Sequence, residues 1–168
     1  MIIFIHSSLH TGGAEILRKS VAFHLRIRNL DFRICLISDI GSNAEVLSRQ
    51  RINIDTLGLS NSIYKFMTTL ALAKYFKQHQ PTIVQSSQFN SNFHTRIAAK
   101  LAGVPVVICE EHGIYHWKHW WHRLADRFLT RWCDKIIAVS QAVNDFNVNE
   151  IGIPSSRIMV LHNCIDTD

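Results

Sequence analysis

Short, almost wholly apolar runs recur along the chain, and longer amphipathic segments separate them. The apolarity of the runs is continuous rather than alternating, which is typical of strands covered on both faces of a parallel sheet. The regular alternation of the two patterns predicts the α/β class, with a doubly wound, Rossmann-like parallel sheet of about seven strands and helices on both faces. The expected strands are 1–5, 32–38, 52–57, 82–86, 104–109, 135–139 and 157–161, and the expected helices are 14–29, 44–51, 63–79, 92–102 and 141–150.

Helical spacing also predicts which side chains face the sheet. Arg18 lies, with three other basic residues of the first helix, away from its apolar face. Ser62 and Ser140 have the positions of N-caps for the helices that follow them. The expected sheet-facing side chains are Ala14, Leu17, Val21 and Leu25 in the first helix, Phe66, Met67, Leu70, Ala73 and Phe76 in the 63–79 helix, and Leu124, Phe128 and Trp132 further along.

Composition narrows the class of protein without identifying a function. The chain has 168 residues, of which 47% are apolar, enough for the core of one ordinary domain. Its formal net charge of +5 favours anionic partners but does not choose among nucleotide phosphates, nucleic acid and anionic membranes. Four scattered cysteines predict buried thiols in a reducing compartment, with neither a disulfide framework nor a zinc site. With neither a signal-peptide start nor a run long enough to span a bilayer, we expect a cytoplasmic protein, soluble or peripheral on the inner membrane face.

Two adjacent glycines occupy the turn that joins the first strand to the first helix. Gly12 and Gly13 have no side chains, so the backbone there can approach a ligand closely. The free N–H groups of the helix start attract anions, which makes this turn a candidate phosphate site. The alternative is a tight strand-to-helix turn of the kind found in any α/β domain.

Several short motifs follow this turn in a fixed order. They are Gly12-Gly13-Ala14-Glu15, Gly103-Val104-Pro105-Val106-Val107, Glu111-His112-Gly113, Ala138-Val139-Ser140, Gly152-Ile153-Pro154 and the closing His162-Asn163-Cys164-Ile165-Asp166. The ordered set resembles the N-terminal domain of family 4 glycosyltransferases of the GT-B fold, over the whole of residues 1–168. The resemblance implies a retaining, nucleotide-sugar-dependent enzyme whose site lies between this acceptor-side domain and a C-terminal nucleotide-sugar domain that is absent from this chain.

The resemblance also implies roles for individual residues. The backbone N–H groups of Gly12 and Gly13 would face the donor phosphates and stabilise charge on the leaving diphosphate. His112 would project into the cleft as the catalytic residue, bonding to sugar or phosphate or assisting proton movement. Glu111, Ser140 and Asn163 are further candidates for substrate binding. Each of these has a structural alternative: Glu111 or its neighbour as a loop anchor, Ser140 as a helix cap, and Asn163 as a hinge turn.

Two departures from the family pattern stand out. The family often has histidines in the loop of the fourth strand, where this chain has Gln85, Ser86 and Ser87. Cys164 replaces the glycine that usually follows the asparagine of the closing segment. The first change puts in doubt any acceptor contact that those histidines make in the family, and the second alters a hinge.

An aromatic and basic stretch, 115–131, contains Trp117, Trp120 and Trp121. Tryptophan rings beside cationic side chains suit the interface of an anionic membrane, and the alternative is a helix whose aromatic side chains cover the sheet. Nucleic-acid stacking has no other support in the sequence. Histidines recur here at spacings of three and four, but without a Cys or carboxylate partner we expect no metal site; they are His112, His116, His119 and His122.

The sequence therefore predicts the acceptor-binding half of a glycosyltransferase. The enzyme would move a sugar from a nucleotide-sugar, which is a substrate rather than a cofactor, to a glycan or lipid-linked acceptor in polysaccharide biosynthesis. We expect the chain to be inactive without its donor half. A non-catalytic module that binds an acceptor or a membrane, and half of a sugar-nucleotide epimerase, are the alternatives. A dinucleotide-dependent oxidoreductase is disfavoured because the first turn lacks the G-x-G-x-x-G spacing.

Overall fold

Seven parallel strands form one sheet in the computed structural model, which describes residues 1–10, 12–59 and 65–163. Their order is β3-β2-β1-β4-β5-β6-β7, and every neighbouring pair is parallel. This sheet confirms the fold class predicted from the apolar runs. The strands are β1 (Ile2–His6), β2 (Phe32–Leu36), β3 (Ile54–Thr56), β4 (Ile83–Ser87), β5 (Val106–Glu111), β6 (Lys135–Ala138) and β7 (Ile158–Val160).

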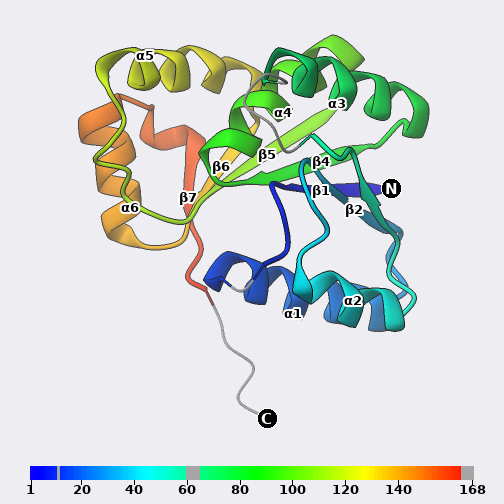
Figure 1. Ribbon diagram of the computed structural model, residues 1–168. Coiled ribbons are helices and arrows are strands. Elements are labelled where there is room, and N and C mark those ends of the chain that lie inside the picture. Colours follow the sequence, from blue (N-terminus) through cyan, green and yellow to red (C-terminus); the bar gives the residue numbers. More distant parts are fainter. Residues whose placement is uncertain (11, 60–64, 164–168) are drawn as a thin grey trace.

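Helices cover both faces of the sheet (Figure 1). Helices α1 (Gly13–Ile27) and α2 (Ser42–Arg49) lie on one face. Helices α3 (Lys65–His79), α4 (Phe89–Ala102) and α5 (Trp120–Leu129) lie on the other. Helix α6 (Gln141–Phe146) continues into a turn of π-helix at Asn147–Ile151 beside α5.

The strand order reverses next to β1, which is where ligands bind in sheets of this kind. Strand β1 pairs with β2 on one side and with β4 on the other, with Ile5 opposite both Cys35 and Ser86. Strand β5 extends the sheet beyond β4 and places Glu110 opposite Ser87. The carboxyl ends of β1, β4 and β5 therefore lie side by side at one edge.

The strands bury apolar side chains on both faces, as their continuous apolarity predicts. Ile3 and Ile5 pack toward α3 and α4, whereas the neighbouring Phe4 packs toward α1 and α2. The thiols of three of the four cysteines are buried and free, and the fourth, Cys164, lies outside the described residues, as does the cap expected at Ser62.

The prediction for α1 is wrong at Arg18, although Leu25 of the predicted face does pack against the core. Arg18, expected away from the sheet, is only 2% exposed, and Ala22 is fully buried. The side chains expected to face the sheet, such as Leu17 and Val21, are half-buried. The cause is a carboxylate on β5 that partners Arg18 and that helical periodicity cannot reveal.

Two other helix faces also differ from the prediction. In α3, Ala73 and Phe76 are buried as expected, but Met67 and Leu70 are about half exposed, at 52% and 50%. In α5, Leu124 and Phe128 were expected to cover the sheet and are instead 59% and 50% exposed. Helix α5 turns a polar residue, Asp126, toward α4, because Arg96 of α4 offers a buried positive charge there.

Candidate functional site

A cavity of about 560 Å³ opens at the carboxyl ends of the central strands. The β1–α1 turn contributes Gly12–Glu15, and the start of α4 contributes Gln88–Asn90. The segment after β5 contributes Tyr115 and Trp117 as well as the His112-Gly113 pair, and Asn163 after β7 completes the wall. Four sequence segments that are far apart along the chain thus meet at the edge where ligands are expected.

The glycine turn presents its backbone to this cavity. Gly12 is the N-cap of α1, has an extended backbone, and accepts a hydrogen bond from Ile16 N at 2.9 Å. The N–H groups of the first helical turn have no intrahelical acceptors, so they can bind an anion. A methyl group added to Gly13 would meet no atom within 4 Å, so Gly13 borders open space. The same addition at Gly12 would lie 2.3 Å from the Glu15 carboxylate, which folds back over the turn.

Gly41, which the sequence analysis did not single out, braces this turn from behind. Its φ of +68° is in the left-handed region, and an added methyl group would lie 2.4 Å from the carbonyl carbon of Leu9. Asn43 then donates from its backbone N to Leu9 O at 3.0 Å and from its side chain to His10 O at 2.9 Å. Glycine is needed at position 41 because two loops meet there, and no local sequence motif predicts this contact.

His112 stands beside a buried carboxylate. Its Nε2 lies 3.3 Å from Oε2 of Glu110, and both side chains are only about one-tenth exposed. Burial opposes ionisation of Glu110, but the hydrogen bond with His112 and the charge of Arg18 outweigh it and hold the pKa of Glu110 well below its usual range. Glu110 is therefore an ionised anchor that fixes the ring of His112 at the cavity wall.

Arg18 connects that anchor to β1. Its guanidinium donates to Glu110 Oε2 at 2.7 Å and to His6 Nε2 at 2.8 Å. Burial, together with the charge of Arg18, lowers the pKa of His6 to about 3, so His6 is neutral and accepts. A chain of polar contacts thus runs from β1 through α1 and β5 to the cavity, in the order His6, Arg18, Glu110 and His112.

Residues of β4 complete the surroundings of Glu110. The side chains of Gln85 and Ser87 both donate to its carboxylate, and Ser86 donates to Asn92 Oδ1 at 2.7 Å. These are the positions where the family often has histidines. In this chain Gln85 and Ser87 hold the Glu110 carboxylate that anchors His112, and Ser86 binds Asn92 instead. None of the three lines the cavity.

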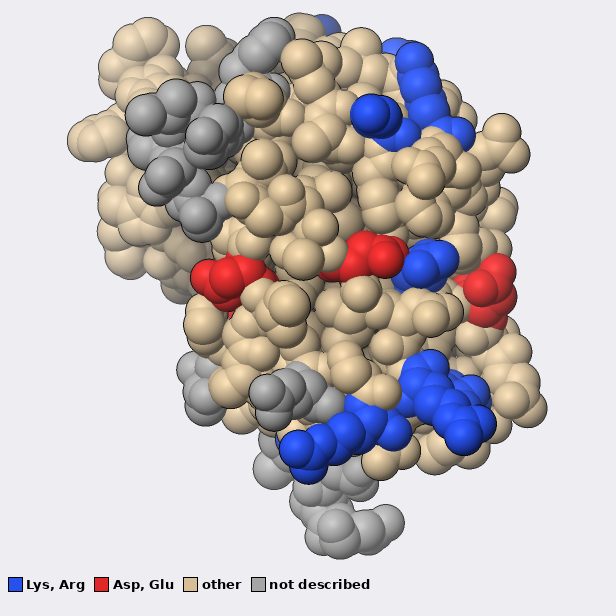
Figure 2. All heavy atoms as spheres, turned by 45° about the vertical axis from the view of Figure 1, so that its right-hand side comes forward, with Lys and Arg blue, Asp and Glu red and all other residues tan. Residues whose placement is uncertain are grey.

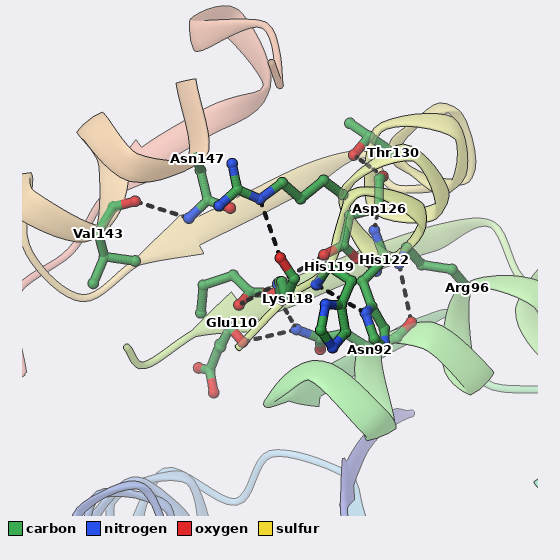
Figure 3. Close-up of polar contacts among 12 residues, drawn as sticks. Asn92, Arg96, Glu110, Lys118, His119, His122, Asp126, Thr130, Val143 and Asn147 are labelled. Carbon is green, nitrogen blue, oxygen red and sulfur yellow. Dashed lines mark hydrogen bonds and ion pairs between the residues drawn. The ribbon is translucent and has the colours of Figure 1, made fainter. Parts of the chain in front are cut away.

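The adjacent Glu111 points to the other face of β5, as alternation along a strand requires. Its carboxylate accepts from Asn92 at 2.9 Å and lies 3.9 Å from the Lys118 ammonium. Lys118 and Arg96 both bind Asp126 of α5, at 2.7 and 2.5 Å (Figure 3). This buried cluster ties the segment after β5 to α4 and α5.

The predicted site residues thus separate into two groups. Gly12, Gly13, His112 and Asn163 line one cavity. Glu111 lies in the buried cluster below it, and Ser140 caps α6, where it accepts from Val143 N at 3.3 Å. The structure brings the first group together and places the other two residues in the roles that the structural alternatives gave them.

Gln88 is a cavity residue that the sequence analysis missed. Its φ of +71° and ψ of 155° belong to a region that is essentially restricted to glycine. Its backbone N donates to Glu110 O at 3.2 Å, and its side-chain amide donates to Glu15 at 3.2 Å across the cavity. A glutamine gives no signal of this geometry, so only the structure identifies it.

The helix α5 presents an exposed apolar stripe. Trp120, Trp121, Leu124 and Phe128 are between 50% and 75% exposed.

Among the described residues, no group of three or more His, Cys, Asp or Glu side chains is placed to hold a metal ion. His122 instead accepts from His119 N at 3.2 Å at the start of α5 (Figure 3). None of the described helices is long and apolar enough to cross a membrane.

The positive charge of the chain is not concentrated at the cavity. None of the described cavity-lining residues is a lysine or arginine. Figure 2 shows one group of basic side chains at the level of α1 and α2, below a row of acidic ones. The exposed arginines at the ends of these helices are Arg26, Arg28, Arg49 and Arg51. An anion in the cavity would therefore contact backbone N–H groups and His112 rather than cationic side chains of this domain.

Comparison with known families identifies the family of this chain. The model of Glycosyltransferase Family 4 matches residues 11–168. The chain belongs to this family, as its ordered motifs predicted. No curated protein matches the sequence.

Solved structures share the fold at low sequence identity. The HepE protein of Anabaena, in complex with UDP and glucose, is 19% identical with a TM-score of 0.78, over 98% of this chain and 45% of that one. The lipopolysaccharide outer core galactosyltransferase WaaB, in its apo form, is 17% identical with a TM-score of 0.74, over 99% and 46%. A UDP-GlcNAc 2-epimerase of Methanocaldococcus jannaschii is 15% identical with a TM-score of 0.66, over 97% and 46%. The chain thus spans less than half the length of these proteins.

Proposed function

We propose that this domain is the acceptor-binding half of a retaining glycosyltransferase that takes its sugar from a nucleotide-sugar donor. The observation that carries the proposal is the cavity that brings together the glycine turn, His112 and Asn163. A second, nucleotide-sugar domain would hold most of the donor and complete the cleft, so this chain alone would not transfer sugar. Family membership favours transfer over the epimerase reaction, whose enzymes share the fold.

The residues of the cavity suit the two demands of the reaction. Charge develops on the departing diphosphate, and the N–H groups of the Gly12-Gly13 turn are preorganised donors for it. The ring of His112, held by Glu110, can bond to the transferred sugar or to phosphate and can assist the proton of the acceptor hydroxyl. The chain needs no cofactor in this scheme, because the nucleotide-sugar is itself a substrate.

The replacement His112→Ala tests this proposal in the domain joined to its nucleotide-sugar partner. We expect kcat to fall about 100-fold or more, because a positioned donor or acid-base group is lost. The unfolding free energy should fall by only about 1 kcal/mol, because Arg18, Gln85 and Ser87 still bind the Glu110 carboxylate when the His112 ring is removed. The matched control is His10→Ala, an exposed histidine of the β1–α1 loop that does not line the cavity, which should leave kcat unchanged. Normal turnover in His112→Ala would remove His112 from the reaction.

We further propose that the apolar stripe of α5 rests on an anionic membrane surface, where a lipid-linked acceptor would be presented. The sequence prediction named Trp117, Trp120 and Trp121; the structure adds Leu124 and Phe128 to the exposed surface. Arg127 and Arg131 are exposed beside the stripe and would meet anionic headgroups.

Vesicle flotation tests the membrane proposal. The chain should float with vesicles of phosphatidylcholine containing phosphatidylglycerol, and Trp120→Ala/Trp121→Ala should float at least about tenfold less, because two interfacial rings are lost. Ile27→Ala is the control, since Ile27 is 75% exposed on α1, away from the stripe. Equal flotation of the double variant and the wild type would exclude the stripe as the membrane contact, and a concentration-dependent dimer that the double variant abolishes would assign it to a protein contact instead.

A further inference from the structure

Three aromatic side chains form one part of the cavity wall. Phe89 comes from the start of α4, and Tyr115 and Trp117 come from the segment after β5. The ring centroid of Trp117 lies 5.2 Å from that of Phe89, with the rings nearly perpendicular, and 5.9 Å from that of Tyr115. Edge-to-face contacts of this kind are favourable and hold the rings at defined angles.

A buried cation fixes this wall from behind. The Lys118 ammonium lies 4.7 Å from the centroid of Phe89 and 4.9 Å from that of Tyr115. Lys118 is 3% exposed and is bound to Asp126, so it cannot swing away from the rings. Trp117 is supported by these neighbours but is itself 52% exposed. The wall therefore has a rigid base and an indole with free surface at the cavity.

The same cavity offers hydrogen-bonding side chains, and none of its described lining residues is a lysine or arginine. Gln88 and Asn90 line it beside Phe89, and Glu15 lies across from them, bonded to Gln88. The amide groups can both donate to and accept from hydroxyl groups, and the carboxylate can accept from them. An aromatic face next to such groups matches a ligand with an apolar face and a polar rim, and a pyranose ring has both.

We propose that Trp117 is the acceptor-recognition residue of this domain, and that its indole stacks on a neutral pyranose ring of the acceptor. The inference rests on the proposed function and deepens it, because it specifies a ring-shaped carbohydrate acceptor. It also separates Trp117 from Trp120 and Trp121, with which the sequence prediction grouped it. Trp117 lines the cavity, whereas the other two lie on the exposed stripe of α5.

Indole N–H signals in an NMR titration of the chain test the proposal. The probes are the methyl pyranosides of glucose, galactose and N-acetylglucosamine, with sorbitol as a control that has the hydroxyl groups but no ring. At least one pyranoside should shift the Trp117 indole signal, and sorbitol should not. Trp117→Ala should weaken binding about tenfold and Trp117→Phe less, because phenylalanine keeps an aromatic face. Trp120→Ala is the matched control and should bind as the wild type does.

Three results would overturn the proposal: no pyranoside shift at Trp117, an equal shift with sorbitol, or unchanged affinity in Trp117→Ala. If Trp117→Ala alters the folding of the chain, Trp117→Phe still tests the proposal. Its affinity for the pyranoside should lie between the affinity of the wild type and the tenfold weaker affinity expected for Trp117→Ala. Nucleotide binding at Gly13, measured on the same samples with UDP, is independent of this outcome. Pyranoside binding without UDP binding would preserve the role of Trp117 and remove the donor role of the glycine turn. UDP binding without pyranoside binding would preserve the donor role of the glycine turn and remove the role of Trp117.

Discussion

Glu110 and Glu111 are neighbours on β5, and each organises a buried cluster on its own face of the sheet. Glu110 faces α1 and is saturated: Arg18, Gln85, Ser87 and His112 all contact its carboxylate. Glu111 faces α4 and α5, and its Oε2 atom has no hydrogen-bond partner among the described residues. The pKa of Glu110 is held well below its usual range, whereas burial raises that of Glu111.

The difference shows what each cluster contributes. A saturated, ionised carboxylate is a fixed reference for the ring of His112, which catalysis by a positioned group requires. In the second cluster, Arg96 and Lys118 both pair with Asp126. If one of the two cations is removed, the other still neutralises the buried carboxylate of Asp126. We assign the first cluster to the site and the second to the attachment of the segment after β5 that bears Tyr115 and Trp117.

Removal of one cation from each cluster should produce the largest contrast in stability. Arg18→Met leaves the ionised Glu110 buried without its cation, which should lower the unfolding free energy by about 3–5 kcal/mol. Lys118→Met should cost only about 1–2 kcal/mol, because Arg96 still binds Asp126 and Glu111 can take up a proton. Urea unfolding monitored by circular dichroism measures both values. Equal losses in the two variants would contradict the distinction between the clusters.

A smaller effect should appear in the pH dependence of stability between pH 7 and pH 5. The pKa of His6 is about 3 in the folded chain against 6.5 for an unperturbed histidine. Between these values the unfolded chain binds one more proton than the folded chain, so the unfolding free energy should fall by about 1.4 kcal/mol per pH unit as the pH drops below 6.5. The depressed pKa of Glu110 removes further stability at still lower pH.

His6→Gln isolates this contribution, because a glutamine oxygen can accept the Arg18 hydrogen bond but does not titrate. Between pH 7 and pH 5 the unfolding free energy should fall less steeply in the variant than in the wild type. The difference between the two slopes should approach the value for one proton, about 1.4 kcal/mol per pH unit. Parallel curves for the variant and the wild type would mean that His6 is not held neutral by burial beside Arg18.

The fold was predictable because its signal is local. Apolar runs such as 32–38 define buried strands from a few adjacent residues, and the periodic segments between them define helices. The helix faces were less predictable, because Arg18 and Asp126 are buried only by partners that are distant in sequence. Charges that are neutralised across the fold look like surface residues in a linear pattern.

The site was predictable in part. The Gly12-Gly13 turn and His112 stood out through their motifs, and the structure places them at one cavity. Gly41 and Gln88 did not stand out, because their importance depends on a contact between loops and on an unusual backbone angle. Trp117 was noticed only as one of three tryptophans, since sequence spacing cannot tell a cavity wall from an exposed stripe.

The central claim is that the glycine turn of this cavity binds the diphosphate of the donor, and a titration of the chain with UDP tests it most directly. The amide signals of Gly13 and Ala14 and the ring signals of His112 should shift together. Gly13→Ala should keep the stability of the wild type, since the added methyl group meets no atom within 4 Å, and should bind UDP at least about tenfold more weakly because the backbone can no longer be approached closely. Shifts that occur elsewhere, or unchanged affinity in Gly13→Ala, would contradict the account.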